Sequence, residues 1–504
     1  MEGTTRYEPK EYGTTLVVLE DMQITSIALD SQSSWTLGRA AAGNTVSIPL
    51  HSPIASRHHG MFLQFNDGWY YVDEPQNLNG TYYNSRKIPR PEPGAKNRVK
   101  LRNGDILRID NDDLQNPDQR GVWMLFTTDA IGGQWQYFPL EGRTEVRIGR
   151  DPQCDLCQPV NYLSRLHARI LLHNGRHYIQ DCNSSAGTWV NNRRIENVQM
   201  LQEKDTIALC DCRFIYTSRG LVYIQRTGGT VTSGGRPGRR SGGKPVLLKA
   251  DIRTRKVPNN SGHGMKELIR DVQLEVKQGT LVALLGPSGA GKSTVMNCLN
   301  GMETQGMEGS VYFNGEDLVA NFERLKHLIG SVPQSSVFHK VLTPEAELRD
   351  AAVLRLPGDT PKKEIEQRVD EVLKKLKLDP VRKTPIGKLS GGEQRRMNIA
   401  IELVADRALW CLDEPDAGLD PQTKRELFTM LRDLAHNDNK SILTIIHDVS
   451  EIDLFDQVIL LAKKDNVGRL AFSGSPAEGR AYFGTDLKNA YSLLESDPGK
   501  YIKN

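Results

Sequence analysis

The segment from Gly286 to Thr294 constrains the fold of this chain more than any other. It fits the pattern G-x-x-x-x-G-K-[ST]. Residues 281–285 before it suit a strand and residues 295–299 after it suit a helix, so the pattern lies between the elements that it requires. Glycines here let backbone N–H groups close on phosphate oxygens, and the positive end of the helix dipole adds to the attraction. The pattern alone also occurs in glycine-rich turns, so the rest of the sequence has to support it.

This segment predicts a site for a nucleotide polyphosphate. Lys292 is expected to neutralise the β- and γ-phosphates, and the Ser293 hydroxyl is expected to ligate Mg²⁺. The predicted phosphate-binding residues are Gly286, Pro287, Ser288, Gly289, Ala290, Gly291, Lys292, Ser293 and Thr294.

Length and composition limit the alternatives. A chain of 504 residues suggests about three domains. The formal net charge is +3, so no broad positive field indicates nucleic acid binding. The sequence has no apolar run long enough for a membrane helix and no signal peptide pattern at its start, so we expect a cytoplasmic protein.

The cysteines admit two interpretations. Seven of them, unevenly placed, do not predict a disulfide framework, which agrees with a reducing compartment. The spacing of Cys154 and Cys157 fits half of a tetrathiolate zinc site, with Cys210 and Cys212 as a second pair. Cysteine is also a common small core residue in strands, and we favour that interpretation.

Residues 1–130 and 131–225 carry one pattern twice. Short apolar segments alternate with Gly, Pro, Asn and Asp turns, which is typical of an all-β sandwich. The second copy repeats the landmarks of the first about 110 residues later. Gly38-Arg39, Ser56-x-x-His59 and Asn79-Gly80-Thr81 recur as Gly149-Arg150, Ser164-x-x-His167 and Ala186-Gly187-Thr188.

With these landmarks each half resembles a forkhead-associated (FHA) domain, a β-sandwich that recognises phosphothreonine through loops at one end. The resemblance covers about residues 14–128 and 131–225. It implies that arginine and serine hold the phosphate while asparagine holds the peptide backbone, and these residue types suit those tasks. His59 is expected to brace the loop. The implied binding residues are Arg39, Ser56, Arg57 and Asn79, with Thr81 as a further contact, and Arg150, Ser164 and Arg165 in the second module.

Two features extend this interpretation. Ala186 stands where the first module has Asn79, and alanine cannot hydrogen-bond a peptide, so weak phosphate binding or a spacer role is expected of the second module. Residues 226–244 are rich in Gly, Ser, Thr and Arg and predict a flexible linker. We hypothesise that a threonine of this linker is phosphorylated and bound by an FHA module, a plain spacer being the alternative. The candidates are Thr227, Thr230 and Thr232.

Residues 245–490 predict alternating strands and helices, and further motifs follow the phosphate loop in order. They are Gln334, the Leu-Ser-Gly-Gly-Glu-Gln segment at 389–394, Asp413-Glu414, Asp420 and His447. Through this order the domain resembles the nucleotide-binding domain of ATP-binding cassette (ABC) proteins, which implies ATP and Mg²⁺ as cofactors. The expected fold is therefore multidomain, with two all-β sandwiches followed by an α/β P-loop NTPase that carries a helical subdomain. In that subdomain a helix is expected to begin with Thr360 as N-cap and Pro361 in its first turn. Its core-facing apolar stripe is predicted to comprise Ile365, Val369, Val372, Leu373 and Leu376.

Phosphoryl transfer needs positioned charge more than covalent help, and this assigns the roles. Ser293, Gln334 and Asp413 are expected to hold Mg²⁺. Glu414 is the natural general base for the attacking water, and His447 is expected to brace the γ-phosphate.

A second anion site is expected at the helix that starts near Ser390. The resemblance implies that this signature segment closes over the ATP of a second copy, in a head-to-tail dimer to which the D-loop residue Asp420 belongs. The signature residues are Ser390, Gly391, Gly392 and Glu393.

Residues 342–357 and 400–404 look like the ABCG-type exporter subfamily, which includes bacterial relatives that join FHA modules to this cassette. In that subfamily a membrane domain follows the cassette. We therefore expect a permease on a separate chain or beyond this sequence, a Thr-phosphorylated partner, and a location at the inner face of the plasma membrane. Residues 491–504 are expected to form a tail. The alternative is a soluble phosphoprotein-binding regulator whose cassette acts as an ATP switch without a permease.

Overall fold

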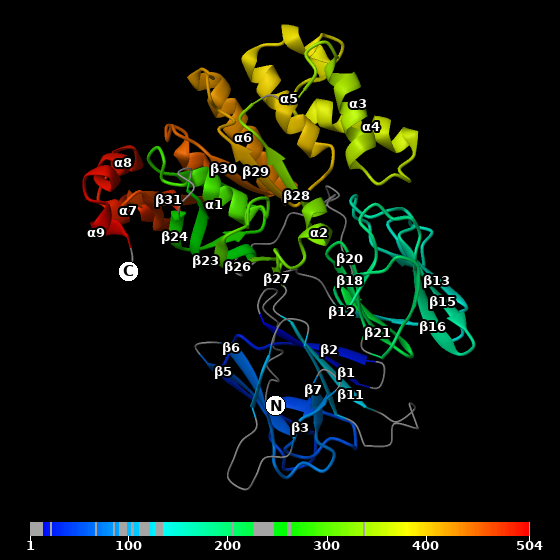
Figure 1. Ribbon diagram of the computed structural model, residues 1–504. Helices are drawn as coiled ribbons and strands as arrows, with labels where there is room; N and C mark the ends of the chain where they lie inside the picture. The colour runs from blue at the N-terminus through cyan, green and yellow to red at the C-terminus, as the bar shows by residue number, and fades with distance from the viewer. Residues whose placement is uncertain are drawn as a thin grey trace, which may run out of the picture.

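The computed structural model describes most of the chain. The described ranges are 14–20, 23–65, 68–83, 86–89, 98–101, 105–109, 121–127, 135–203, 205–224, 246–259, 264–335 and 338–502. Three bodies follow one another in sequence, two β-modules and a cassette domain of residues 246–502 (Figure 1). The predicted linker, with Thr227, Thr230 and Thr232, lies outside the described residues.

The first module is a two-sheet sandwich, as the alternating pattern predicted. Within the described residues, one sheet has the order β2-β1-β11-β10-β7-β8 and the other the order β4-β3-β5-β6-β9. Inward residues such as Leu37, Phe62 and Tyr71 are fully buried between the sheets. The strands are β1 (Thr15–Glu20), β2 (Gln23–Ala28), β3 (Ser34–Arg39), β4 (Ile48–Leu50), β5 (Gly60–Phe65), β6 (Gly68–Asp73), β7 (Thr81–Tyr83), β8 (Arg86–Lys87), β9 (Arg98–Lys100), β10 (Asp105–Ile109) and β11 (Val122–Thr127).

The second module repeats the sandwich with one change at a sheet edge. Its sheets have the orders β12-β22-β21-β20-β17-β18 and β14-β13-β15-β16-β19. The last strand of the module, β22, lies beside β21, and the first strand, β12, pairs outside it. The strands are β12 (Trp135–Pro139), β13 (Glu145–Gly149), β14 (Leu156–Cys157), β15 (Ala168–His173), β16 (Arg176–Asp181), β17 (Trp189–Val190), β18 (Arg193–Arg194), β19 (Val198–Met200), β20 (Thr206–Leu209), β21 (Cys212–Thr217) and β22 (Gly220–Ile224).

The two modules pack on each other through an apolar cluster outside their own cores. Val17, Ile106 and Leu125 of the first module meet Ile215 and Val222 of the second, and all five are buried. Burial of such side chains is the main stabilising contribution to a contact of this kind.

The cassette domain is built on a sheet in the order β27-β26-β23-β24-β32-β31-β25-β30-β29-β28. The central strands β25, β30, β29 and β28 run parallel. Alternate residues of β25 enter two different cores, so both faces of the sheet are covered. The strands are β23 (Val246–Pro258), β24 (Met265–Lys277), β25 (Leu281–Leu285), β26 (Met307–Phe313), β27 (Glu316–Asp317), β28 (Ile329–Val332), β29 (Leu409–Asp413), β30 (Ser441–Ile445), β31 (Gln457–Lys464) and β32 (Val467–Gly474).

The helices divide between this sheet and a helical subdomain. In Figure 1, α3, α4 and α5 form the yellow lobe above the second module. The apolar stripe predicted between Ile365 and Leu376 packs into the core of this lobe, as expected. The helices are α1 (Lys292–Leu299), α2 (Phe322–Leu325), α3 (Pro344–Arg355), α4 (Lys362–Lys375), α5 (Gly391–Leu403), α6 (Pro421–Asn437), α7 (Pro476–Phe483), α8 (Leu487–Ser496) and α9 (Pro498–Tyr501).

The C-terminal segment corrects one prediction. Residues from 491 were expected to form a tail, but α8 and α9 pack on the sheet next to α7 (Figure 1). Leu494, Tyr501 and Ile502 are buried in the larger core of the domain. The prediction failed because the stretch is mostly polar and only a few apolar residues anchor it to the core. Within the described ranges, none of the helices combines the length and apolar character that crossing a bilayer requires.

A buried ion pair joins the second module to the sheet of the cassette domain. The Arg324 side chain, 1% exposed, forms a salt bridge with Glu316 and donates to the carbonyl oxygen of Cys210. Arg213 of the second module donates from Nε to the same carboxylate at 3.0 Å. Burial alone would raise the pKa of Glu316, but the two guanidinium groups outweigh it and hold that pKa below its usual value.

We predict that Arg324→Met lowers the free energy of unfolding by about 3–5 kcal/mol, because it leaves a buried carboxylate short of a partner. Chemical denaturation of the full chain, followed by tryptophan fluorescence, measures the loss. The control is Lys326→Met, which removes an exposed cation paired with Glu323 and should cost less than about 1 kcal/mol. Equal losses in the two variants would contradict the role given to Arg324.

Candidate functional sites

The phosphate loop lies between β25 and α1, as the pattern predicted. Gly286 has φ 150°, and Gly291, which caps α1, has φ 85°. A Cβ at Gly286 would lie 2.6 Å from the carbonyl oxygen of Leu461, and one at Gly291 would lie 2.6 Å from Cγ2 of Ile269. Both positions therefore require glycine for space as well as for conformation.

Lys292 is held inside this loop. Its Nζ donates to the carbonyl oxygens of Gly286 at 2.8 Å and Pro287 at 3.2 Å. Burial lowers the pKa of Lys292, while the charges of Glu414 and Asp413 oppose that shift. The loop thus presents a buried ammonium among backbone N–H groups at the start of a helix, which suits an anion.

Asp413 and Glu414 lie close to the phosphate loop because parallel strands end at one edge of the sheet. β25 pairs with β30 and β30 with β29. Asp413 is therefore the last residue of one strand, and Gly286 and His447 follow the ends of its neighbours. Burial raises the pKa of Asp413, and the Glu414 charge adds to the rise. Glu414 has φ 47°, a backbone conformation that is rare outside glycine and is often found at functional sites.

Glu414 is the centre of a polar group that unites three predicted residues. Gln334 donates from Nε2 to its Oε2 at 2.7 Å, and Nε2 of His447 lies 2.7 Å from its Oε1. A carboxylate only accepts, so the proton of His447 in this contact is on Nε2. Both oxygens of Glu414 are therefore oriented by side chains from other loops.

The signature residues start α5 in the helical lobe. Ser390 caps the helix in a capping box with Glu393, whose backbone N–H donates to the Ser390 hydroxyl at 3.3 Å. Asp420 caps α6 and accepts from the N–H of Thr423 at 3.0 Å. These contacts fix both helix starts.

Arg395 connects the signature helix to the site and was not predicted from the sequence. Its Nη1 donates to the carbonyl oxygen of Gln334 at 2.6 Å, and its Nη2 donates to that of Ala417 at 3.3 Å. The helical lobe thereby touches the loop that carries Gln334 and the loop before Asp420. In the sequence, the one feature that could have indicated Arg395 was its place in the second turn of the signature helix.

In the first module, three of the predicted residues meet around one loop. Arg39 donates to the carbonyl oxygen of Pro53 at 3.1 Å, and Asn79 donates to that of Ile54 at 2.7 Å. The Ser56 hydroxyl accepts from the N–H of Leu78 at 3.0 Å. Arg57 lies beside Ser56 and is exposed. The end of the sandwich thus gathers an arginine, a hydroxyl and an amide.

Two residues behind this loop are structural. His59 is buried, and its Nδ1 accepts from the N–H of Ser56 at 3.1 Å, which agrees with the predicted bracing role. Thr81 was predicted to contact a ligand, but its side chain is fully buried. Its hydroxyl donates to Asp73 at 2.6 Å and lies 2.8 Å from the Tyr71 hydroxyl. Thr81 therefore forms hydrogen bonds inside the sandwich and is not a ligand contact, which corrects the prediction.

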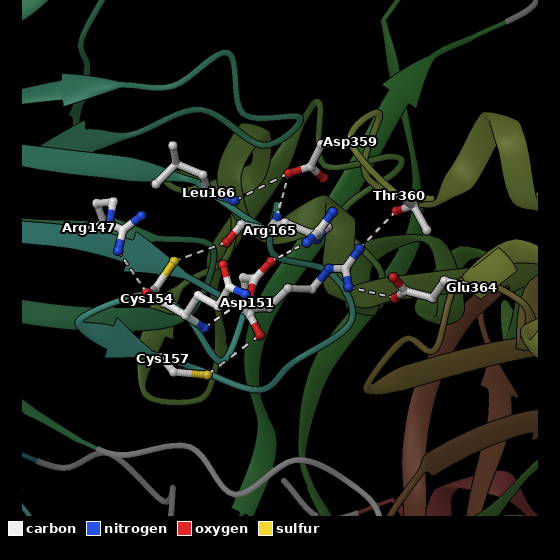
Figure 2. A network of polar contacts seen from close by, with 11 residues as sticks. Arg147, Asp151, Cys154, Cys157, Arg165, Leu166, Asp359, Thr360 and Glu364 are labelled. Atoms are coloured by element: carbon white, nitrogen blue, oxygen red, sulfur yellow. Dashed lines mark hydrogen bonds and ion pairs between the residues drawn. The ribbon is translucent and has the colours of Figure 1, made fainter. Parts of the chain in front are cut away.

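In the second module, two of the predicted residues, Arg150 and Arg165, contact the cassette domain, and Figure 2 shows Arg165 beside Asp359. Arg150 binds Glu364 and Thr360, and the backbone N–H of Arg165 donates to Asp359. The Ser164 hydroxyl accepts from the N–H of Ser185 at 3.3 Å. Ala186, in the place of the asparagine, is buried.

The cysteines near this surface bind backbone oxygens. The Cys154 thiol donates to the carbonyl oxygen of Arg165 at 3.3 Å, and the Cys157 thiol donates to that of Arg150 at 3.5 Å. Burial raises the pKa of Cys154 to about 11. Over the part of the chain that the structure describes, no group of three or more His, Cys, Asp or Glu residues could hold a metal ion.

Comparisons with known proteins agree with this geometry. Residues 269–417 match the family model described as ABC transporter, and residues 35–110 and 146–210 match the FHA domain model. The chain is 34% identical over 360 residues to the ABC transporter ATP-binding/permease protein Rv1747 of Mycobacterium tuberculosis, a match covering 70% of this chain and 38% of that protein.

Two further known proteins are similar to part of this chain. Over 227 residues the chain is 36% identical to the broad substrate specificity ATP-binding cassette transporter ABCG2 of Bos taurus, covering 44% of this chain and 33% of that protein. A solved dimeric structure of the ATP-binding cassette MJ0796 bound to ADP and Pi is 25% identical, with a TM-score of 0.39, and covers 45% of this chain and 98% of that one. The chain thus spans well under half the length of the curated relatives described here.

Gly468 of β32 is a further residue of the site that the sequence pattern did not indicate. A Cβ there would lie 2.1 Å from the carbonyl oxygen of Ala290 in the phosphate loop. We predict that Gly468→Ala displaces the loop and weakens nucleotide binding about fivefold or more, as overpacking of about 1–3 kcal/mol implies. Titration with a fluorescent ATP analogue measures this. Gly499→Ala, at a site with more space, is the control. Unchanged affinity for Gly468→Ala would contradict the packing argument.

Proposed function

We propose that this chain, in which two FHA domains precede an ABC transporter ATP-binding domain of the ABCG type, is the ATP-hydrolysing subunit of an exporter. Phosphothreonine binding by the FHA region, through the site of its first domain, recruits or regulates it. The observation that carries the proposal is the orientation of Glu414 by Gln334 and His447 beside the buried Lys292. A carboxylate fixed at both oxygens near a phosphate loop suits the activation of water.

The residues present fit ATP and Mg²⁺. Backbone N–H groups of the loop and the ammonium of Lys292 suit the phosphates, and the exposed Ser293 hydroxyl with Asp413 and Gln334 provides the oxygen ligands that Mg²⁺ prefers. ATP supplies the anhydride bond, and Mg²⁺ neutralises the charge that develops when it is cleaved. The protein has only to place charges correctly around them.

The residues of this chain divide the work as follows. Glu414 accepts the proton of the attacking water, while Gln334 and His447 keep its oxygens pointed at one place. Lys292 stabilises negative charge on the leaving side. Arg395 couples the loop of Gln334 to the signature helix, so closure of the helical lobe acts directly on the site.

The assembly completes the proposal. The signature segment starting at Ser390 closes over the nucleotide of a second copy, and the motion of this dimer drives a permease on another chain or in a following segment. The names of the relatives support this, since Rv1747 is an ATP-binding/permease protein and ABCG2 is a transporter. We place the subunit at the inner face of the plasma membrane, where the permease would hold it.

The first FHA domain provides the phosphothreonine site of the proposal. Arg39 and Ser56 suit phosphate oxygens, and Asn79 suits the peptide backbone. They meet at one end of the sandwich, where loops are open to a partner, and Arg57 adds an exposed positive charge. A Thr-phosphorylated protein, or the linker of the chain itself, is the proposed ligand.

Two substitutions in the cassette test hydrolysis. Lys292→Ala should abolish ATP binding, because it removes the buried ammonium from the loop. Glu414→Gln should bind ATP and dimerise, yet lower the rate of phosphate release at least about a hundredfold, as loss of a general base does. Equilibrium ATP binding and steady-state phosphate release measure both. Normal turnover by Glu414→Gln would contradict the base assignment.

Phosphothreonine recognition by the first module is tested on the full chain with a phosphothreonine peptide library. The double variant Arg39→Ala, Ser56→Ala should lose captured peptides, since both phosphate contacts are gone. Lys100→Ala, which removes an exposed cation at the opposite end of the sandwich, is the control and should bind as the wild type does. If the double variant captures the same peptides, the first module is a scaffold.

A further inference from the structure

The phosphate-recognition end of the second FHA domain is in contact with the turn between α3 and α4 of the cassette (Figure 2). The segment in contact comprises Gly358 to Glu364, from the turn after α3 into the first turn of α4. It is here called the acidic turn after Asp359 and Glu364, the side chains that it offers to the second module, although it also contains Lys362 and Lys363. It lies about 200 residues away in sequence from the loops that it touches. The contact brings together the residues that the sequence assigned to phosphate and two acidic side chains of the same chain.

Asp359 occupies the backbone donors of the recognition loop. Its Oδ2 accepts from the N–H of Arg165 at 2.5 Å and from the N–H of Leu166 at 3.3 Å. Both donors follow Ser164 directly. A carboxylate that accepts two backbone N–H bonds is bound as an anion, in the way that a phosphate oxygen would be.

The guanidinium group of Arg150 binds the same turn. Its Nη1 forms an ion pair with Glu364 at 2.6 Å, and its Nη2 donates to the Thr360 hydroxyl at 3.0 Å. The Arg150 side chain is 10% exposed and the Glu364 side chain is 37% exposed, so the arginine is shielded from water while the carboxylate is shielded only in part.

Because of this contact, α4 begins without a side-chain cap. The sequence predicted Thr360 as the N-cap of α4, but the capping position is Pro361 and no side chain caps the helix. The hydroxyl serves Arg150 instead. A helix start without a side-chain cap is less stable than a capped one, and the contact with Arg150 offsets that loss.

Further bonds widen the contact on both sides. The N–H of Gly358 donates to the Ser185 hydroxyl at 3.0 Å, and Asn161 donates to Asp406 at 2.8 Å. The same module also contacts Glu316 of β27 and Arg324 of α2. The second FHA domain therefore touches the helical subdomain and the nucleotide-binding core at once.

We propose that the second FHA domain is an intramolecular receptor whose ligand is the acidic turn of its own cassette. Asp359 and Glu364 take the positions of a phosphorylated ligand, and the domain acts as a clamp between the helical subdomain and the core. While the clamp is closed, Arg150 and the N–H groups after Ser164 are not open to a phosphothreonine. The inference goes beyond the proposed function, because it depends neither on hydrolysis nor on the first FHA domain.

Distance measurement by double electron–electron resonance on the full chain tests the clamp. Spin labels are attached through non-natural residues at Asn174 of the second module and Lys374 of the helical subdomain, both exposed, so the native cysteines stay intact. The wild type should give one narrow distance distribution. Asp359→Lys with Glu364→Lys should abolish the narrow peak, because like charges then face Arg150.

Two further variants make the test specific. Arg150→Glu should also lose the narrow peak, and Arg150→Glu combined with Glu364→Arg should regain it, which excludes misfolding as the cause. Asp350→Lys, an exposed site in α3 outside the contact, is the matched control and should keep the peak. A broad wild-type distribution, or a peak that survives both charge reversals, would overturn the clamp.

Failure of the clamp can be distinguished from failure of the proposed function. Phosphate release is measured on the same preparations. A chain without ATPase activity that keeps the narrow peak would refute the enzyme and support the clamp, and an active ATPase without the peak would do the reverse.

Discussion

The cassette depends on holding the Lys292 ammonium in a buried place where burial alone would favour its neutral form. Two features oppose this, the carbonyl oxygens of Gly286 and Pro287 and the charges of Glu414 and Asp413. Parallel strands that end at one sheet edge bring these groups together. The glycines are needed because the loop is pressed between β24, β31 and β32, with no room for a side chain at Gly286, Gly291 or Gly468. The proposed phosphate site is thus a consequence of how the sheet is ordered.

Much of this could be predicted from the sequence, since the determinants are local. The glycines and lysine of the loop, the alternating strands of the modules and the stripe of α4 each follow from residues near one another in the chain. Contacts between distant segments could not be predicted in this way. Arg150 and Glu364 are 214 residues apart, and nothing in either neighbourhood indicates the other. Thr81 was misread because a threonine after Asn-Gly suits a ligand contact and an internal hydrogen bond equally well.

The two FHA domains have the same fold, but the arginines of their recognition loops have different partners. They share the sandwich, and each has a buried histidine behind the recognition loop, His59 and His167. Arg39 donates to a carbonyl oxygen of its own module, whereas Arg150 donates to side chains of the cassette. Loss of the asparagine at position 186 fits this difference, because a ligand supplied by the same chain is positioned by the fold and needs no separate contact to its backbone.

We propose that this cassette hydrolyses ATP through attack by water at the site built around Glu414. The most direct measurement is turnover of ATP by the purified full chain with Mg²⁺ in ¹⁸O-labelled water, followed by mass analysis of the products. The account predicts that the released phosphate carries one solvent oxygen and that ADP carries none. Release of no phosphate by folded protein that binds ATP, or phosphate without solvent oxygen, would contradict it.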